Sequence, residues 1–420
     1  MRQNGKASEC SSRFNPRLLR VEGEDDARRL LEELGTDSIG ASIMSKKMAH
    51  VVIKVENVEA RAANVIKQVM LSKGGECATP RDTLLKMTEH VSVIMIGTVR
   101  QFFEAVKNFS MQPFGLKALA GEVEALLRDA LPHKGATHAI QAGEYTLKTG
   151  GRTLVMGVVN VTPDSFSDGG RFVELESAHA HALEMAASGV DIIDIGGEST
   201  RPGAEPVSVD EEARRTITFI ESLAREIRVP ISIDTYKAEI ASMALDAGAS
   251  LVNDISALRL DEKMAPLIAD RGAPVILMHM RGTPGNMQES PVYDDVVGDI
   301  LRFLRERSEF AREAGVMPEK IMIDPGIGFG KTVEHNLEIM RRLEEFKSLG
   351  YPLVLGASRK RFIGSVLERE VGERLMGTAA TVAFAIARGV DIVRVHDVPE
   401  MLEVAKMADA LAGKWRPDEE

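Results

Sequence analysis

Polar and charged side chains stand at the ends of eight short apolar runs in this chain: 153–160, 190–197, 229–235, 250–256, 274–280, 321–326, 352–358 and 391–397. Carboxylates, amides and cationic groups are the types that bind polar heterocycles, phosphates and hard metal ions. At the run ends stand Asn160, Glu198, Asp234, Asn253, Asp254, His279, Asp324, Ser358, Lys360, Arg394 and His396. Buried strands alternating with helical patterns predict a (β/α)8 TIM barrel, where strand C-termini meet at one face. We therefore expect these side chains to share one mouth.

The acidic and amide residues of this set suit a flat heterocycle. Asp234 and Asn253 end two consecutive runs, and Asp324 ends a later one. An aspartate only accepts hydrogen bonds, whereas an asparagine both donates and accepts, so together they can bind a donor–acceptor edge. Several carboxylates in one apolar mouth are expensive to bury without a partner, which favours a ligand there.

The cationic residues suit a phosphate or pyrophosphate. Lys360 follows the seventh run, and Arg394 lies inside the eighth. Strand alternation points Arg394 and His396 the same way, and Arg201 in the second loop could join them. Phosphate sites near strands seven and eight recur in this fold. The amide oxygen of Asn160 suits Mg2+.

The chain has 420 residues, which predicts two domains, with a boundary near residue 140. Residues 141–420 would form the barrel, with a hairpin at 145–155 that could close its N-terminal end. Residues 1–140 predict a smaller N-terminal α/β domain of unassigned role. Its expected strands are 49–55 and 91–96, and its expected helices are 25–34, 57–73, 99–109 and 113–131, with Asn57 as an N-cap.

Bulk properties exclude several classes of protein. The net charge of −11 leaves no global basic surface for nucleic acid. Cys10 and Cys77 are the only cysteines and lie outside the barrel, so a disulfide framework or a cysteine zinc site is not supported. The first 20 residues lack the apolar core of a signal peptide, and no run reaches the length of a membrane span. A cytoplasmic enzyme is the expectation.

Taken together, eight ordered motifs resemble the dihydropteroate synthase family over roughly residues 145–415. They are VMGVVNVTPDSFSDGG (155–170), DIIDIGGESTRPGA (191–204), SIDTYKAE (232–239), VNDIS (252–256), LMHMRGTPGNMQ (277–288), IDPGIGFGKT (323–332), LGASRKRFIG (355–364) and GTAATVAFAIARGVDIVRVHDV (377–398). The resemblance implies joining of 6-hydroxymethyl-7,8-dihydropterin diphosphate to p-aminobenzoate, with release of pyrophosphate, and a homodimer formed through the barrel.

The resemblance also implies a role for individual residues, with Asp234, Asn253, Asp324 and Lys360 as the catalytic set. The pterin would be held by Asp234, Asn253, Met278, Asp324, Lys360 and Arg394. p-Aminobenzoate would be held by Phe166, Thr200, Pro202, Phe329 and Ser358. The diphosphate would be received by Asn160, Arg201, Arg394 and His396, with Mg2+ near Asn160.

Two alternatives remain open from the sequence. A pterin-dependent methyltransferase acting on a corrinoid protein shares the barrel and the Asp/Asn clamp, but it does not need the SFSDGG and ESTRPGA loops. A non-catalytic pterin-binding protein is suggested by the N-terminal domain, which most synthases of the family lack.

Overall fold

The structure is a computed structural model, and it describes residues 17, 19, 21, 23–83, 85, 89–129, 138–161, 171–199 and 206–414. The chain forms two compact units, Met1–Lys134 and Gly135–Glu420. Each unit has its own buried apolar core. None of the helices in these described ranges is long and apolar enough to cross a membrane.

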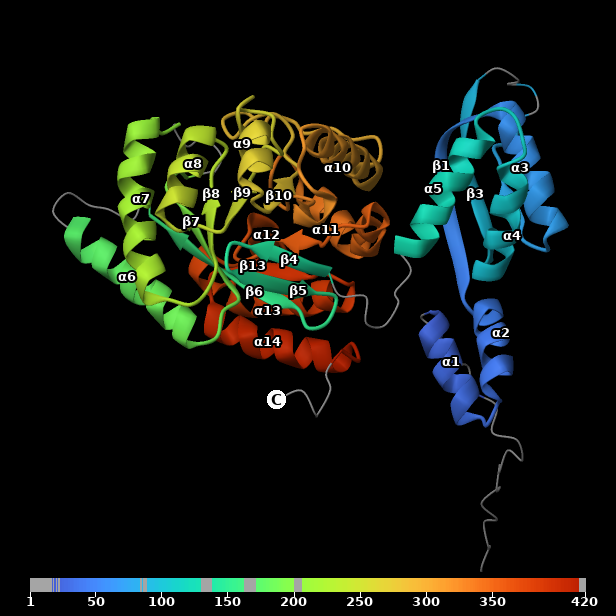
Figure 1. The fold of residues 1–420 in the computed structure, drawn as a ribbon, viewed down its shortest axis with the longest axis horizontal. Coiled ribbons are helices and arrows are strands. Elements are labelled where there is room, and N and C mark those ends of the chain that lie inside the picture. Colours follow the sequence, from blue (N-terminus) through green and yellow to red (C-terminus); the bar gives the residue numbers. More distant parts are fainter. Residues whose placement is uncertain are drawn as a thin grey trace, which may run out of the picture. The chain divides into compact units, whose positions relative to one another are not determined.

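Eight parallel strands form the sheet of the second unit (Figure 1). They are β6 (Leu154–Asn160), β7 (Ile192–Gly196), β8 (Ile231–Asp234), β9 (Leu251–Asp254), β10 (Val275–Met278), β11 (Ile321–Asp324), β12 (Val354–Leu355) and β13 (Ile392–Val395). Their order is β11-β10-β9-β8-β7-β6-β13-β12, and a parallel bridge between Ile323 and Leu353 brings the two end strands together. The predicted barrel is confirmed, and each strand lies within the apolar run that predicted it.

Helices follow the strands and cover the outside of the barrel. They are α6 (Arg171–Ala187), α7 (Val209–Glu226), α8 (Ala238–Ala247), α9 (Met264–Arg271), α10 (Val296–Glu313), α11 (Val333–Arg341), α12 (Arg361–Leu367), α13 (Leu375–Ala387) and α14 (Val398–Leu411). In α7, Phe219, Ile220 and Leu223 share the buried face, which is the spacing of an amphipathic helix. The Ser208 side chain accepts a hydrogen bond from the Glu211 amide and so caps its N-terminus.

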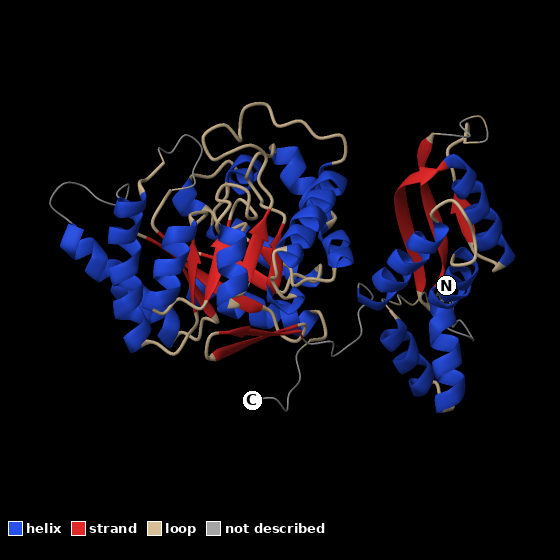
Figure 2. Ribbon diagram, turned by 45° about the horizontal axis from the view of Figure 1, so that its top comes forward, coloured by secondary structure: helices blue, strands red, loops and turns tan. Residues whose placement is uncertain are grey.

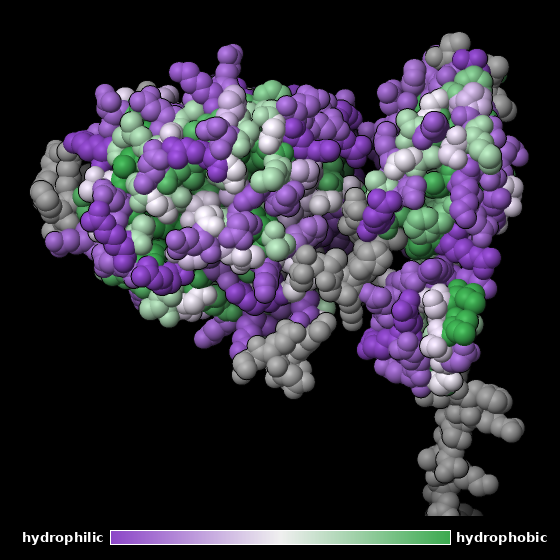
Figure 3. Space-filling model, in the orientation of Figure 1, coloured by the Kyte–Doolittle hydropathy of each residue, from purple (hydrophilic) through white to green (hydrophobic). Residues whose placement is uncertain are grey.

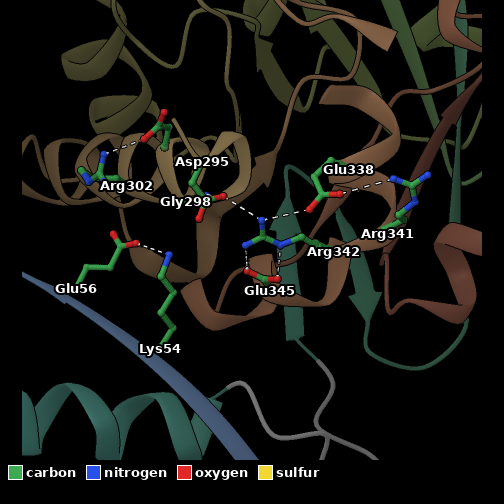
Figure 4. A network of polar contacts seen from close by, with 10 residues as sticks. Lys54, Glu56, Asp295, Gly298, Arg302, Glu338, Arg341, Arg342 and Glu345 are labelled. Atoms are coloured by element: carbon green, nitrogen blue, oxygen red, sulfur yellow. Dashed lines mark hydrogen bonds and ion pairs between the residues drawn. The ribbon is translucent and has the colours of Figure 1, made fainter. Parts of the chain in front are cut away.

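Arg342 fastens three of the outer segments to one another (Figure 4). Its Nη1 lies 2.9 Å from Oδ1 of Asp295, which is also the N-cap of α10. The same guanidinium makes two bonds of 2.6 and 2.8 Å to Glu345 in the 3-10 helix η3 (Leu343–Leu349) and a longer one of 3.4 Å to Glu338 in α11. One planar cation thus positions the segments that follow β10 and β11.

An antiparallel hairpin closes the N-terminal end of the barrel, but it forms at 138–149 and not at the predicted 145–155, because Leu154 and Val155 belong to β6 and 145–149 pairs with the segment before it. Its strands are β4 (His138–Ala142) and β5 (Tyr145–Thr149), seen beneath the barrel strands in Figure 2. Ile140, Ala142 and Leu147 pack with inward side chains from the barrel strands, among them Ile192 and Ile392, in one buried cluster. A binding or catalytic site is therefore expected at the opposite end of the barrel, where the strands have their C-termini.

The first unit is a three-stranded antiparallel sheet with helices. Its strands are β1 (His50–Glu59), β2 (Glu76–Ala78) and β3 (His90–Thr98), in the order β1-β3-β2. Its helices are α1 (Glu24–Glu33), α2 (Ser38–Met48), α3 (Ala60–Ser72), α4 (Val99–Phe109) and α5 (Leu116–Asp129). Figure 3 shows an apolar patch over α2, where Ile39, Ile43 and Met44 are exposed.

One local prediction in this unit was wrong. Asn57 does not cap a helix; it lies inside β1 with φ of 57°, where the pairing with β3 shifts register between Val55 and Val58. Asparagine tolerates this left-handed conformation, which a bulge requires, so a turn-forming residue marked a bulge and not a helix start. The helix α3 begins three residues later, after Glu59.

Candidate active site

Arg394 is the centre of a charged cluster inside the mouth of the barrel. Its Nε donates to Oδ2 of Asp194 on β7 at 2.6 Å, and its Nη2 donates to Oδ2 of Asp234 on β8 at 2.8 Å. Although burial acts to lower it, the two carboxylates raise the pKa of Arg394, so the guanidinium stays charged. Burial raises the pKa of Asp234 to about 7, with Arg394 opposing and Asp194 reinforcing the shift. Arg394 therefore holds Asp194 and Asp234 beside each other in the mouth.

Asn253 and Asp324 extend this cluster along β9 and β11. Asn253 Nδ2 donates to Asp194 Oδ2 at 3.1 Å, which orients its amide. Asp324 Oδ1 accepts the Gly326 amide at 2.7 Å. A side chain on Gly356 would come within 3.9 Å of Asp324 Oδ2 and 3.7 Å of Arg394 Cδ, so the two residues flank the same glycine. Burial raises the pKa of Asp324.

Lys360 lies beside an apolar wall of the mouth. Its Nζ is 4.2 Å from the centre of the Phe329 ring, a cation–π distance. Burial lowers the pKa of Lys360 to about 8, and the charge of Arg394 acts in the same direction. Phe329 and Met278 are both buried and share one cluster with Ile255, Met280 and Met287.

His396 and Ser358 lie together at the ends of β13 and β12. His396 Nδ1 is 3.0 Å from the Ser358 hydroxyl, and the His396 amide donates to the same oxygen at 3.3 Å. Burial lowers the pKa of His396 to about 4, helped by Arg394 and Arg359, so the imidazole is neutral at physiological pH. Asn160 ends β6 with an exposed side chain.

The geometry therefore brings together side chains from all eight barrel strands or the residues that directly follow them. Phe166, Thr200, Arg201 and Pro202 were also predicted in the site, but they lie outside the described residues, as does the first loop, 162–170.

Comparison with known proteins identifies the family to which the chain with this site belongs. The family model described as "Pterin binding enzyme" matches residues 156–396. The dihydropteroate synthase of Synechocystis is 50% identical over 278 residues, which cover 66% of this chain and 95% of that protein. The chain belongs to the dihydropteroate synthase family. This result favours the synthase over the methyltransferase and over the non-catalytic binding protein.

A solved structure and an archaeal protein add to this family assignment. The Xanthomonas albilineans dihydropteroate synthase with 4-aminobenzoic acid superposes with a TM-score of 0.62 at 42% identity, covering 66% of this chain and 98% of that one. A probable bifunctional folylpolyglutamate synthase/dihydropteroate synthase of Haloferax volcanii is 40% identical over 93% of this chain, which spans 46% of that protein. The archaeal match therefore includes much of the N-terminal unit.

Asp194 is the residue of this synthase mouth that the sequence did not single out. It is fully buried, and its Oδ2 accepts from both Arg394 and Asn253. Ile193 and Ile195 belong to the outer core, while Ile192 belongs to the inner cluster, so alternation turns Asp194 inward. The sequence did hold a signal for Asp194: it is a charged residue inside an apolar run, and it has the same strand parity as Ile192, two positions earlier.

Two other polar strand-end residues support loops. Asp254 is buried and accepts from the amide and hydroxyl of Ser256, each at 2.7 Å, and from the Leu258 amide at 2.9 Å. His279 was expected to be a satisfied histidine and not a ligand, and its Nδ1 lies 2.9 Å from Lys331 Nζ in the β11–α11 loop. Asp254 therefore holds backbone directly, whereas His279 contacts Lys331, whose Nζ in turn donates to the Gly326 and Phe329 carbonyls.

Proposed function

We propose that the Arg394 cluster is where this dihydropteroate synthase binds its pterin. Asp234, Asn253 and Asp324 meet the polar edge of the ring, because carboxylates accept and an amide both accepts and donates. Lys360 donates to the same ligand, while Met278 and the Arg394 plane cover its faces. The observation that carries this proposal is the convergence of Asp234 and Asn253 on Arg394 from different strands, Asp234 by a direct bond and Asn253 through Asp194.

The same cluster suits the bond-breaking step. The methylene carbon of the dihydropterin loses its bond to the diphosphate oxygen, and pyrophosphate leaves with the electron pair. The positive charge that develops on the pterin methylene is stabilised by preorganised carboxylates in a site from which water is largely excluded. The p-aminobenzoate nitrogen then bonds to that carbon and releases a proton, so it needs mainly orientation.

The second substrate and the leaving group take the outer part of the mouth. Phe329 and Ser358 are proposed to line the p-aminobenzoate pocket, together with Phe166, Thr200 and Pro202. Arg201, Arg394, His396 and Asn160 are proposed to receive the diphosphate. A neutral His396, with its pKa lowered to about 4, serves as a hydrogen-bonding group and not as a cation at pH 7.

Mg2+ is proposed near Asn160. A side chain on Gly196 would lie 3.6 Å from Asn160 Oδ1 and 3.8 Å from Asp234 Oδ2, so an amide and a carboxylate oxygen flank one open strand end. Within the described ranges, no group of three or more His, Cys, Asp or Glu side chains could hold a metal. The donors fit an ion that takes few protein ligands and completes its shell with phosphate oxygens and water, as Mg2+ does. Bound there, it would neutralise charge on the departing pyrophosphate.

The direct test is turnover of both substrates. The purified protein is incubated with 6-hydroxymethyl-7,8-dihydropterin diphosphate, p-aminobenzoate and Mg2+, and pyrophosphate and dihydropteroate are measured in parallel. Equal yields of the two products are expected. Pterin binding without any turnover would refute the proposed reaction at this site.

Activity should fall at alkaline pH because Lys360 loses its proton. The ammonium makes charge-assisted hydrogen bonds, which weaken when it becomes a neutral amine, so kcat/KM, which reports the free enzyme, should decline as pH rises through its pKa of about 8. Lys360→Arg keeps its charge to much higher pH and should lose this alkaline limb, at a lower maximal rate. If the limb stays in the arginine variant, another group causes it.

We further propose a homodimer formed through α13. This helix has no charged residue, and Met376 and Phe384 are exposed on it, two helical turns apart. Val366 and Leu367 of α12 add exposed apolar surface. A barrel helix that is apolar all round favours being covered by a partner.

Light scattering tests this proposal. The wild type should have the mass of two chains, and Met376→Glu with Phe384→Glu should have the mass of one, because charges would be buried in the interface. Val292→Glu, at an exposed apolar residue outside α12–α14, is the matched control and should remain dimeric. A monomeric wild type would contradict the proposal. The cytoplasmic location expected from the sequence stays a prediction.

A further inference from the structure

Lys237 lies at the base of the connection between β7 and α7. It follows β8 and directly precedes α8. Its Nζ donates to Glu198 Oε2 at 2.5 Å, to the Val207 carbonyl at 2.6 Å and to Glu212 Oε2 at 2.6 Å. Glu198 stands before residues 200–205 in the chain and Val207 stands after them, so one ammonium contacts both ends of that connection.

Further contacts hold the incoming end. The Tyr236 hydroxyl donates to the second Glu198 oxygen at 2.7 Å. Arg215 on α7 donates to the Gly197 carbonyl at 2.9 Å. A side chain on Gly197 would come within 2.6 Å of the Thr216 methyl group, so only glycine allows the chain to lie this close to α7.

The charges make Lys237 necessary to this arrangement. Its side chain is 15% exposed, and those of Glu198 and Glu212 are 8% and 1% exposed. Burial raises the pKa of Glu212, whereas Lys237 acts to keep it ionised. Without the ammonium, two buried carboxylates would face each other with no cation between them, which is strongly unfavourable.

The proposed reaction gives Lys237 no role, although it lies only three residues after Asp234. The chain between its two contact points carries Thr200, Arg201 and Pro202. Those residues belong to the p-aminobenzoate and diphosphate half of the proposed site, whereas the pterin half comes from other strand ends. Fixing both ends of a connection reduces the entropy lost when its side chains engage a substrate.

We propose that Lys237, with Glu198 and Glu212, is a positioning residue that anchors the β7–α7 connection for binding of p-aminobenzoate. This inference rests on the proposed function of the mouth. It predicts a larger effect on p-aminobenzoate than on the pterin, because Lys237 bonds to Glu198, Val207 and Glu212, and Asp234 of the pterin pocket is coupled to Glu212 only through charge.

The test measures each substrate separately in Lys237→Met, which keeps the length of the side chain and removes its charge. We expect the KM for p-aminobenzoate to rise at least about 10-fold, while calorimetric affinity for 6-hydroxymethylpterin stays within about twofold. Lys237→Arg should recover most of the loss because it keeps the charge. Glu198→Gln should give a smaller rise and serves as the second variant if Lys237→Met does not fold.

Lys320→Met is the matched control. Lys320 is also a buried lysine that contacts a backbone carbonyl, that of Gln141, but it lies at the closed end of the barrel. The Lys320→Met variant should be less stable than the wild type but should have the same KM for p-aminobenzoate. An unchanged KM in Lys237→Met would overturn the proposal, and so would an equal loss for both substrates or the same KM change in Lys320→Met.

The activity of the wild type tests the proposed function separately from the anchoring by Lys237. If the wild type does not form dihydropteroate, hydrogen exchange of peptides spanning residues 197–208 decides the anchoring itself. Faster exchange there in Lys237→Met than in Lys320→Met supports the anchor, and equal exchange refutes it.

Discussion

Replacing Asp324 by Asn should weaken pterin binding by at least about 100-fold, which corresponds to about 3 kcal/mol of charge-assisted hydrogen bonding. The amide has nearly the volume of the carboxylate, so packing in the mouth is preserved. It loses the negative charge, however, and presents donors in place of one acceptor. Calorimetric titration with 6-hydroxymethylpterin measures the effect.

Stability distinguishes this functional loss from a folding defect. Burial raises the pKa of Asp324 in the folded protein above its unfolded value, so its ionised form is a cost at neutral and higher pH. Asp324→Asn should therefore be at least as stable as the wild type at pH 8, and the difference should shrink as pH falls through the folded pKa.

Asp391→Asn is the matched control. Asp391 precedes β13 at the opposite end of the barrel, where it accepts from Lys347 and from the Leu353 amide, both at 2.8 Å. This variant should lose stability and keep its pterin affinity. Unaltered pterin affinity in Asp324→Asn would remove Asp324 from the pocket.

Arg394→Met should abolish turnover and also destabilise the empty enzyme by about 3–5 kcal/mol near neutral pH. Arg394 contacts Asp194 and Asp234 directly, so its removal leaves two buried carboxylates without their cation. The folded pKa of Asp234, which burial already raises, would then rise further above its unfolded value. Stability would be retained at low pH, where Asp234 is protonated, and lost as pH rises through its folded pKa.

Urea denaturation at pH 5.5 and pH 8 measures this dependence, and the deficit relative to the wild type should be larger at pH 8. Adding Asp194→Asn to Arg394→Met should restore part of the stability, since one unpaired charge is gone, but should not restore turnover. A deficit that does not depend on pH would show that packing, and not the ion pairs, is the main contribution of Arg394.

The sequence predicted more of the barrel than of the first unit. Each barrel strand is a continuous apolar run, because both faces of a parallel strand are buried, and such runs are readable without knowing their neighbours. In the first unit, β2 has only three residues and was not predicted, and α2 exposes Ile39 and Ile43 and so lacks a clear polar face. Asn57 was misread because the same residue type serves a cap and a bulge.

The sequence by itself determined the eight strands, the face on which their polar ends meet and the family of the chain, because these depend on residue type and on order along the chain. Only the tertiary structure decided which polar residues touch one another. It paired Arg394 with Asp194 and Asp234, turned Asp254 and His279 to supporting loops, and placed Lys237 between both ends of the β7–α7 connection. Those partners lie up to 200 residues apart, as Arg394 and Asp194 do. Strand alternation fixes which way a side chain points, but closure of the barrel fixes what it meets.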